Sequence, residues 1–315
     1  MNNDRRKFLQ STSLLATTYL LAKPLKSIAG VSTNNFLNRR LQLNAINIIH
    51  TGNLHGKLYP FALGYLNNVG GLHNIHSIVK DSRAASMIVD AGGFLGTSGL
   101  IDNDINLVRQ MGKTGYTAVT IGDKELAKGE AYLASLVPYM DFTVVNCNYN
   151  FSNAALKAKV SAYHIVRHGQ YKIGITGVGP INGNVACSNP VKKANEVASY
   201  LKNELNCDLV ICLSQLGYEQ KSDQGGNKAF AAASENIDII IGGHDKTVVH
   251  PQLIIRNNEK KQVVLSNGGF GGAVLGTVTF GFNDKRGLQT FNCKNYVPGT
   301  NTGSSFYDNY TKLTA

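Results

Sequence analysis

Four short polar segments carry the side chains that could do chemistry, each directly after an apolar run. The segments are Asn53 to His55, Asp123-Lys124, Gln215 and His244 to Lys246. Imidazole and carboxylate groups bind divalent metals, whereas lysine ammonium groups oppose metals and bind phosphate. An Asp-x-His-Gly arrangement after a strand would hold a metal, but this chain has Asn53 in place of the acid. The residue types therefore indicate either a depleted metal site or an anion site.

Apolar runs that alternate with helix-length segments must position these residues. We expect strands at residues 45–50, 86–90, 117–121, 142–146, 208–214 and 237–242, a hairpin at 162–178, and antiparallel strands between 253 and 282. We expect helices at residues 101–113, 130–137, 189–206 and 226–235. This alternation predicts an α/β sandwich. In such sheets, ligands bind beyond the carboxyl ends of the strands.

Five segments at the expected strand ends carry a combined signal. They are IHTGNLHGKL from Ile49, VDAGGFLGTS from Val89, YTAVTIGDKE from Tyr116, DLVICLSQLGY from Asp208 and DIIIGGHDK from Asp238. In their order and intervals they resemble the 5′-nucleotidase branch of the calcineurin-like metallophosphoesterases. The resemblance implies a four-layer α-β-β-α sandwich of the metallophosphoesterase type, expected at residues 45–285.

The resemblance also implies two divalent metals that activate water to attack a phosphate ester. Several of the family's functional positions carry unsuited residues here. They are Asn53 for the first aspartate, Gly93 for the bridging aspartate, Lys124 for the catalytic histidine, and Gln215 and Lys246 for two ligand histidines. The donors that remain are His55, Asp123 and His244. Loss of the bridging carboxylate alone should abolish two-metal catalysis.

A single weak metal site is one interpretation of these residues. Asp123, His244 and Gln215 could together hold one divalent ion, whereas the other site keeps too few ligands. The protein would then be a divergent hydrolase of phosphate esters or nucleotides, with Lys124 and Lys246 binding the phosphate.

A non-catalytic relative is the favoured interpretation. Its cleft is either an anion pocket without metal or a decayed site in which Lys124 and Lys246 are only solvated replacements. His55, Lys124, His244 and Lys246 could cradle a phosphate or a nucleotide-like anion through charged, hydrogen-bonding groups. The cofactor would then be absent or limited to one weakly bound metal. The protein would be a catalytically impaired relative that binds an anion or a partner chain.

The N-terminal segment resembles a twin-arginine export signal. Its 29 residues contain the pair Arg5-Arg6, a following apolar run and a small-residue cleavage motif. We therefore expect a periplasmic protein with a linker at residues 30–44 and a polar tail at 286–315. The signal carries a net +4 of the chain's +11, which leaves +7 and favours anionic partners.

The basic residues are scattered, without an arginine-rich run, so nucleic-acid binding is not expected. No apolar stretch reaches the roughly 18 residues of a membrane helix, so no transmembrane segment is expected in the mature chain. Family members carry a C-terminal domain that grips the nucleoside. By that resemblance we expect nucleoside recognition either to require a separately encoded C-terminal-domain protein or not to occur.

Overall fold

The computed structural model describes residues 45–64, 66–80, 86–97, 99–219, 225–299, 306 and 310. By its internal contacts the chain divides into two compact units. One is Ile46–Thr279 with Asn292–Ala315, and the other is Phe280–Phe291 with Met1–Ala45. The expected export signal and linker lie outside the described residues. All candidate site residues belong to the larger unit.

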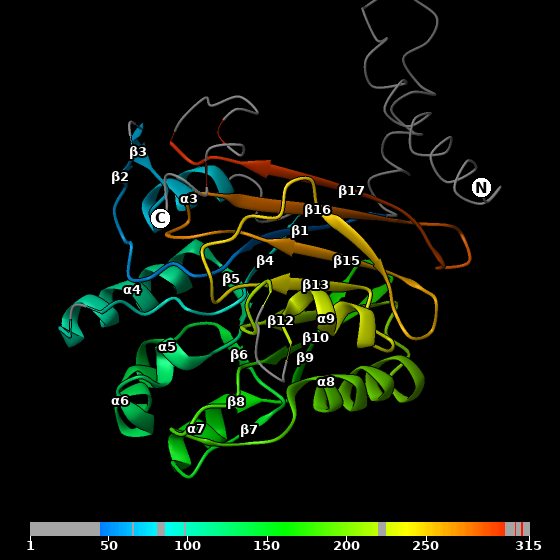
Figure 1. Ribbon diagram of the computed structural model, residues 1–315, viewed down its shortest axis with the longest axis horizontal. Coiled ribbons are helices and arrows are strands. Elements are labelled where there is room, and N and C mark those ends of the chain that lie inside the picture. The colour runs from blue at the N-terminus through cyan, green and yellow to red at the C-terminus, as the bar shows by residue number, and fades with distance from the viewer. Residues whose placement is uncertain are drawn as a thin grey trace, which may run out of the picture. The chain divides into compact units, whose positions relative to one another are not determined.

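The strands and helices alternate along most of the chain (Figure 1). The strands are β1 (Ala45–Thr51), β2 (Phe61–Leu63), β3 (Leu66–Val69), β4 (Ser86–Asp90), β5 (Tyr116–Val119), β6 (Thr143–Val145), β7 (Tyr149–Asn150), β8 (Val160–Ser161), β9 (Tyr163–His168), β10 (Tyr171–Val178), β11 (Ala186–Cys187), β12 (Leu209–Ser214), β13 (Ile239–Gly242), β14 (Leu253–Arg256), β15 (Gln262–Asn267), β16 (Leu275–Phe282) and β17 (Leu288–Tyr296). The helices are α3 (Leu72–Val79), α4 (Ile101–Thr114), α5 (Asp123–Leu126), α6 (Gly129–Leu136), α7 (Ala154–Lys159), α8 (Pro190–Ser199) and α9 (Asn227–Ala233), with a 3₁₀ turn at Val137–Tyr139 and a π-helical turn at Tyr200–Glu204. None of the described helices is long and apolar enough to cross a membrane.

Two sheets organise the described residues. The seven-stranded sheet has the order β17-β16-β1-β4-β5-β6-β8, with β1, β4, β5, β6 and β8 parallel. The six-stranded sheet has the order β14-β15-β13-β12-β10-β9, with β10, β12, β13 and β15 parallel and antiparallel strands at both edges. Parallel strands end at the same edge of a sheet, so the loops that follow them gather there.

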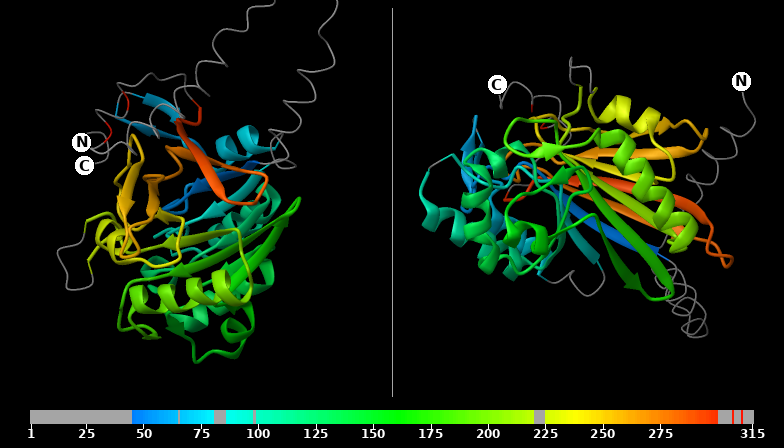
Figure 2. Two further views of the ribbon diagram at one scale, coloured as in Figure 1. Left: turned by 90° about the vertical axis from the view of Figure 1, so that its right-hand side faces the viewer. Right: turned by 90° about the horizontal axis from the view of Figure 1, so that it is seen from below.

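Each sheet carries its own group of helices. Apolar side chains of α3, α4 and α6, such as Leu72, Leu107 and Leu133, form one core with β1, β4, β5 and β6. The helices α8 and α9 form a second core with β10, β12, β13 and β15, and lie side by side against that sheet (Figures 1 and 2). Between the sheets, His50 Nε2 on β1 lies 2.9 Å from Ser266 Oγ on β15. The α/β fold is confirmed, and the packing is consistent with the expected four-layer order.

The described part of the smaller unit is a hairpin tip formed by the end of β16 and the start of β17. The rings of Phe280 and Phe291 pack with their centroids 6.3 Å apart. The Asn283 side chain accepts the N–H groups of Lys285 and Gly287, which closes the turn. The strand β17 begins at Leu288, inside the segment 286–315 that is expected from the sequence to be a polar tail.

Candidate functional site

The motif loops meet at the carboxyl ends of the parallel strands. The loop after β1 bonds to the loop after β4, because Asn53 N donates to Gly92 O at 2.7 Å. The loops after β12 and β13 are joined by Gly243 N, which donates to Ser214 O at 2.8 Å. Side chains link loops of the two sheets, because Asn53 bonds to the loop after β13 and Gln215 bonds to the loop after β4.

Asn53 is fully buried and faces the loop after β13. Its Nδ2 donates to the main-chain oxygen of Asp245 at 2.7 Å, and its Oδ1 is buried without a hydrogen-bond partner. The residue has a φ of 59°, a left-handed conformation that asparagine adopts more readily than most residues. The amide thus serves as a donor between loops, which an ionised aspartate could not do.

Gly93 leaves no room for the bridging carboxylate that the resemblance implies. Its φ is 70°, and a Cβ added there would lie 2.9 Å from Asn53 Oδ1 and 3.3 Å from Gln215 Nε2. Any side chain at this position would strain the backbone and displace its neighbours. The space between the loops is filled by the two amides.

Gln215 is fully buried at the centre of the loops. Its Nε2 donates to Ala91 O at 2.6 Å, while its Oε1 is buried without a partner. The side chain is packed so closely on glycines that a Cβ at Gly122 would come within 2.8 Å of its Cγ, and one at Gly243 would clash with its Nε2. The glycines make room for this glutamine, which ties the β12 loop to the β4 loop.

Asp123 and His244 form an ion pair across the two sheets. His244 Nδ1 lies 3.4 Å from Asp123 Oδ1, and neither atom makes a hydrogen bond. The close carboxylate raises the pKa of His244 above its ordinary value, against the effect of burial. Burial alone would raise the pKa of Asp123, but His244 and Lys124 outweigh it and lower that pKa. A protonated His244 binds the carboxylate and cannot ligate a metal through its ring nitrogens.

His55 lies beside the same charges and is neutral at physiological pH. Burial is the largest cause that lowers its pKa to about 4, and Lys124, Lys246 and Lys57 lower it further. Asp123 acts in the opposite direction. The structure therefore brings the four predicted anion-binding residues into one electrostatic neighbourhood.

The two replacement lysines differ in their surroundings. Lys124 is half-buried at the start of α5, whereas Lys246 is exposed and its Nζ lies 5.7 Å from the centroid of the Phe270 ring. The same ring contacts the imidazole of His55, with centroids 4.9 Å apart. A cation held over an aromatic face is partly positioned before any ligand arrives.

Glu125 is a site residue that was not among the candidates expected from the sequence. Its buried carboxylate accepts the N–H groups of Gly93 at 3.1 Å, Leu95 at 3.1 Å and Gly122 at 2.9 Å. Burial raises its pKa in spite of these bonds. The only sequence signal was an acid next to Lys124. Glu125 holds the β4 and β5 loops together and thereby positions Asp123 and Lys124.

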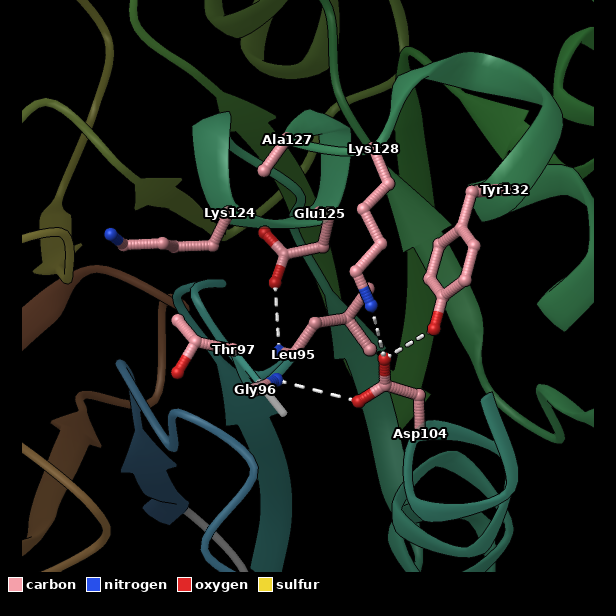
Figure 3. Close-up of a pocket in the computed structure, with 9 residues that line it drawn as sticks. All are labelled: Leu95, Gly96, Thr97, Asp104, Lys124, Glu125, Ala127, Lys128 and Tyr132. Carbon is pink, nitrogen blue, oxygen red and sulfur yellow. Dashed lines mark hydrogen bonds and ion pairs between the residues drawn. The ribbon is translucent and has the colours of Figure 1, made fainter. Parts of the chain in front are cut away.

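Two hollows open beside the motif loops. The smaller, of about 240 Å³, is lined by residues of the β4 loop, α4, α5 and α6 (Figure 3). The larger, of about 490 Å³, is lined mainly by residues 55–61. In Figure 3, Lys124 extends away from Asp104 and Tyr132 and its ammonium group lies outside their hydrogen-bonded cluster.

The donor set does not fit a two-metal centre. In the described part of the chain, no three His, Cys, Asp or Glu side chains are grouped so that they could hold a metal ion. The buried site atoms that have no hydrogen-bond partner are Asn53 Oδ1, Asp123 Oδ1, Gln215 Oε1 and His244 Nδ1. These atoms include one carboxylate oxygen and two neutral amide oxygens, a set of donors for one cation at most.

Comparison with known proteins finds sequence similarity to enzymes that act on nucleotides. No family model matches it. It is 22% identical to a 5′-nucleotidase of Vibrio parahaemolyticus over 78% of this chain and 48% of that protein. It is 23% identical to a 2′,3′-cyclic-nucleotide 2′-phosphodiesterase/3′-nucleotidase of Haemophilus influenzae over 83% of this chain and 46% of that protein. The chain thus spans about half the length of these two relatives.

The solved structure of a 5′-nucleotidase precursor from Thermus thermophilus has the same fold. It superposes with a TM-score of 0.71 at 22% identity, over 85% of this chain and 58% of that chain. The chain is a relative of the 5′-nucleotidases and calcineurin-like phosphoesterases and has the fold of their N-terminal metallophosphoesterase domain.

Proposed function

We propose that this protein binds a phosphate-bearing anion at His55, Lys124, His244 and Lys246 and does not hydrolyse it through two metals. One observation carries the proposal. At two positions where the family resemblance implies metal ligands, Asn53 and Gln215 donate their amide N–H groups to main-chain carbonyls. These amides hold the loops together without a metal.

The charge balance of the pocket supports an anion. Lys124, Lys246 and a His244 with raised pKa bring positive charge to the loops, and Asp123 balances part of it. The neutral His55 can donate one ring N–H to a phosphate oxygen. Charge-assisted hydrogen bonds from lysine and imidazolium are the strong contacts that phosphate recognition uses.

The test is isothermal titration of inorganic phosphate into protein treated with EDTA. We expect binding at millimolar phosphate or below, and a roughly tenfold loss of affinity in Lys124→Gln or Lys246→Gln. Lys192→Gln is the matched control, because this exposed lysine lies on α8 and lines neither hollow. Absence of any heat at millimolar phosphate would reject the proposal.

A second candidate function is hydrolysis with a single metal. The buried atoms Asp123 Oδ1, Gln215 Oε1 and His244 Nδ1 favour it, because none makes a hydrogen bond and, with His244 neutral, one divalent ion could bind all three. This function requires His244 to leave its ion pair with Asp123. Metal analysis of the purified protein, followed by phosphatase assays with Mn²⁺, Zn²⁺ or Co²⁺, tests it. Turnover that vanishes in both Asp123→Ala and His244→Ala would establish it over the anion-binding function.

We further propose export by the twin-arginine route, which the Arg5-Arg6 pair and the apolar run after it support. Replacing both arginines by lysine should retain the protein in the cytoplasm of a fractionated cell. Periplasmic recovery of that variant would contradict the export route.

A further inference from the structure

The dipeptide Asn182-Gly183 lies at a turn between β10 and β11. Asn-Gly occurs twice in the chain, here and at Asn267-Gly268. An asparagine followed by glycine is prone to lose its side-chain amide, because the glycine has no Cβ to shield the main-chain nitrogen that attacks the asparagine Cγ. The two pairs have the same covalent chemistry, so their surroundings in the fold decide which of them reacts.

The turn holds the Asn182 side chain in place for this attack. Asn182 Oδ1 accepts the main-chain N–H of Asn184 at 2.9 Å. The hydrogen bond closes a ring of atoms that contains both Asn182 Cγ and the Gly183 nitrogen, so the side chain lies along the main chain. The same donor stabilises the negative charge that develops on Oδ1 during the attack. Gly183 is exposed, and no described residue beyond its chain neighbours lies within 4 Å of an added Cβ, so water reaches the turn.

The second pair, Asn267-Gly268, is held rigidly at the end of β15. Asn267 is 1% exposed, and it pairs in register with Gly242 of β13. Its Oδ1 packs so closely on Gly242 that a Cβ added there would clash with it. Gly268 forms an isolated β-bridge with Val248. A buried side chain confined in this way cannot turn towards the next main-chain nitrogen, because the closely packed neighbours leave it no space.

We propose that Asn182 is a site of spontaneous deamidation, and that the fold directs this modification to Asn182 and away from Asn267. The Gly183 nitrogen forms a bond to Asn182 Cγ and gives up its proton, while Nδ2 takes up a proton and leaves as ammonia. Water then adds to one of the two carbonyl carbons of the resulting succinimide ring and breaks the bond from that carbon to nitrogen, which yields aspartate or isoaspartate. Water is the only co-reactant. This inference does not depend on the proposed anion binding.

The product adds a negative charge at a turn that contacts α5. In the amide form, Asn182 Nδ2 donates to the Tyr149 hydroxyl at 3.3 Å, and that hydroxyl donates to Pro180 O at 2.9 Å. A carboxylate cannot donate, so deamidation removes the first of these hydrogen bonds. Asn184 Nδ2 joins the same turn to Leu126 O at the end of α5, at 3.2 Å. The modification therefore changes the surroundings of the helix that carries two of the candidate site residues.

The test is peptide mapping of the full-length protein after prolonged incubation at mildly alkaline pH. Trypsin should release Asn182 within residues 173–192 and Asn267 within residues 262–285, because lysines bound both peptides. Electron-transfer fragmentation locates the mass gain that corresponds to the exchange of NH₂ for OH. We expect Asn182 to react roughly tenfold or more faster than Asn267 in the folded protein, and the two to react at similar rates in protein unfolded in guanidinium chloride.

Gly183→Ala should slow the reaction of Asn182 roughly tenfold or more, because the new methyl group shields the attacking nitrogen and the turn has room for it. Asn184→Ala is the matched control, since it keeps both Gly183 and the main-chain N–H that bonds to Asn182 Oδ1. Equal rates at Asn182 and Asn267 in the folded protein would overturn the proposal, as would a folded Asn182 that stays intact while the unfolded chain reacts. An unchanged rate in Gly183→Ala would exclude attack by the Gly183 nitrogen and would also overturn it.

Discussion

The side-chain amide of Asn53 donates a 2.7 Å hydrogen bond to the main-chain carbonyl of Asp245, 192 positions away in the chain. Gln215 does the same for Ala91 at 2.6 Å across 124 positions. An ionised carboxylate could not donate in either place. The two amides therefore join loops of the two sheets through hydrogen bonds, where the family resemblance implies metal ions.

Asn53→Asp should destabilise the protein in the presence of EDTA. The substitution removes the donor to Asp245 and brings a carboxylate oxygen close to a buried carbonyl oxygen. Loss of a buried hydrogen bond of this kind costs about 1–3 kcal/mol in the free energy of unfolding. Urea denaturation would measure the loss, with Asn106→Asp as the control at an exposed asparagine on α4. Equal midpoints for the two variants would contradict the role of the amide.

The sequence predicts the buried parallel strands well, because a strand covered on both faces is a continuous apolar run such as Leu209–Ser214. The short strands β2 and β3 and the helix α3 are not expected from the sequence, because segments this short show no clear hydrophobic periodicity. The strand β17 was missed because its side chains are mostly exposed or half-buried polar groups.

At the site, the sequence predicts which residues meet, because each one follows a parallel strand. The sequence does not predict their hydrogen-bond partners. The partners of Asn53 and Gln215 are main-chain carbonyls, which carry no side-chain signature, and they lie far away in the chain. The three N–H donors to Glu125 are also main-chain groups, so the sequence does not indicate them either.

Gly93→Ala should destabilise the protein more than Gly129→Ala. Both glycines have left-handed φ angles, 70° and 82°, so both substitutions carry a backbone cost of about 1–2 kcal/mol. At Gly129 nothing lies within 4 Å of an added Cβ, whereas at Gly93 it lies 2.9 Å from Asn53 Oδ1. The difference between the losses of unfolding free energy in the two variants measures the cost of the contact with Asn53 Oδ1. If the two variants lose equal stability, the loops can accept a side chain at position 93.

The Asp123–His244 pair should stabilise the protein in a defined pH window. The pKa of His244 is raised on folding, so its contribution is present below the ordinary histidine pKa and is lost as pH rises through the raised value. The pKa of Asp123 is lowered, so its contribution is present above the ordinary aspartate pKa and is lost as pH falls through the lowered value. Both contributions are complete between about pH 4 and 6.5.

Asp123→Asn should therefore cost more stability at pH 5.5 than at pH 9. Urea denaturation of the wild type and the variant at both pH values measures the difference. His164→Gln serves as the control, because burial lowers the pKa of His164 and no acid contributes to that shift. A loss in Asp123→Asn that is the same at both pH values would show that the pair is not formed in solution.

Glu125→Gln should loosen the loops that carry Asp123 and Lys124. The carboxylate accepts three main-chain N–H groups in a buried position, and an amide would turn its own N–H₂ towards at least one of them. We expect a loss of at least about 1–3 kcal/mol in the free energy of unfolding, together with weaker phosphate binding, because the N–H left unpaired is buried.

Glu130→Gln is the matched control, since Glu130 also accepts N–H groups, from Ser152 at 2.8 Å and Asn153 at 2.7 Å, but lies at a more exposed position. An exposed donor can turn to water, so its loss should be smaller. Equal losses of unfolding free energy in both variants would mean that burial of the Glu125 carboxylate does not strengthen its hydrogen bonds to the loops. Unchanged phosphate affinity in Glu125→Gln would mean that anion binding does not depend on these hydrogen bonds.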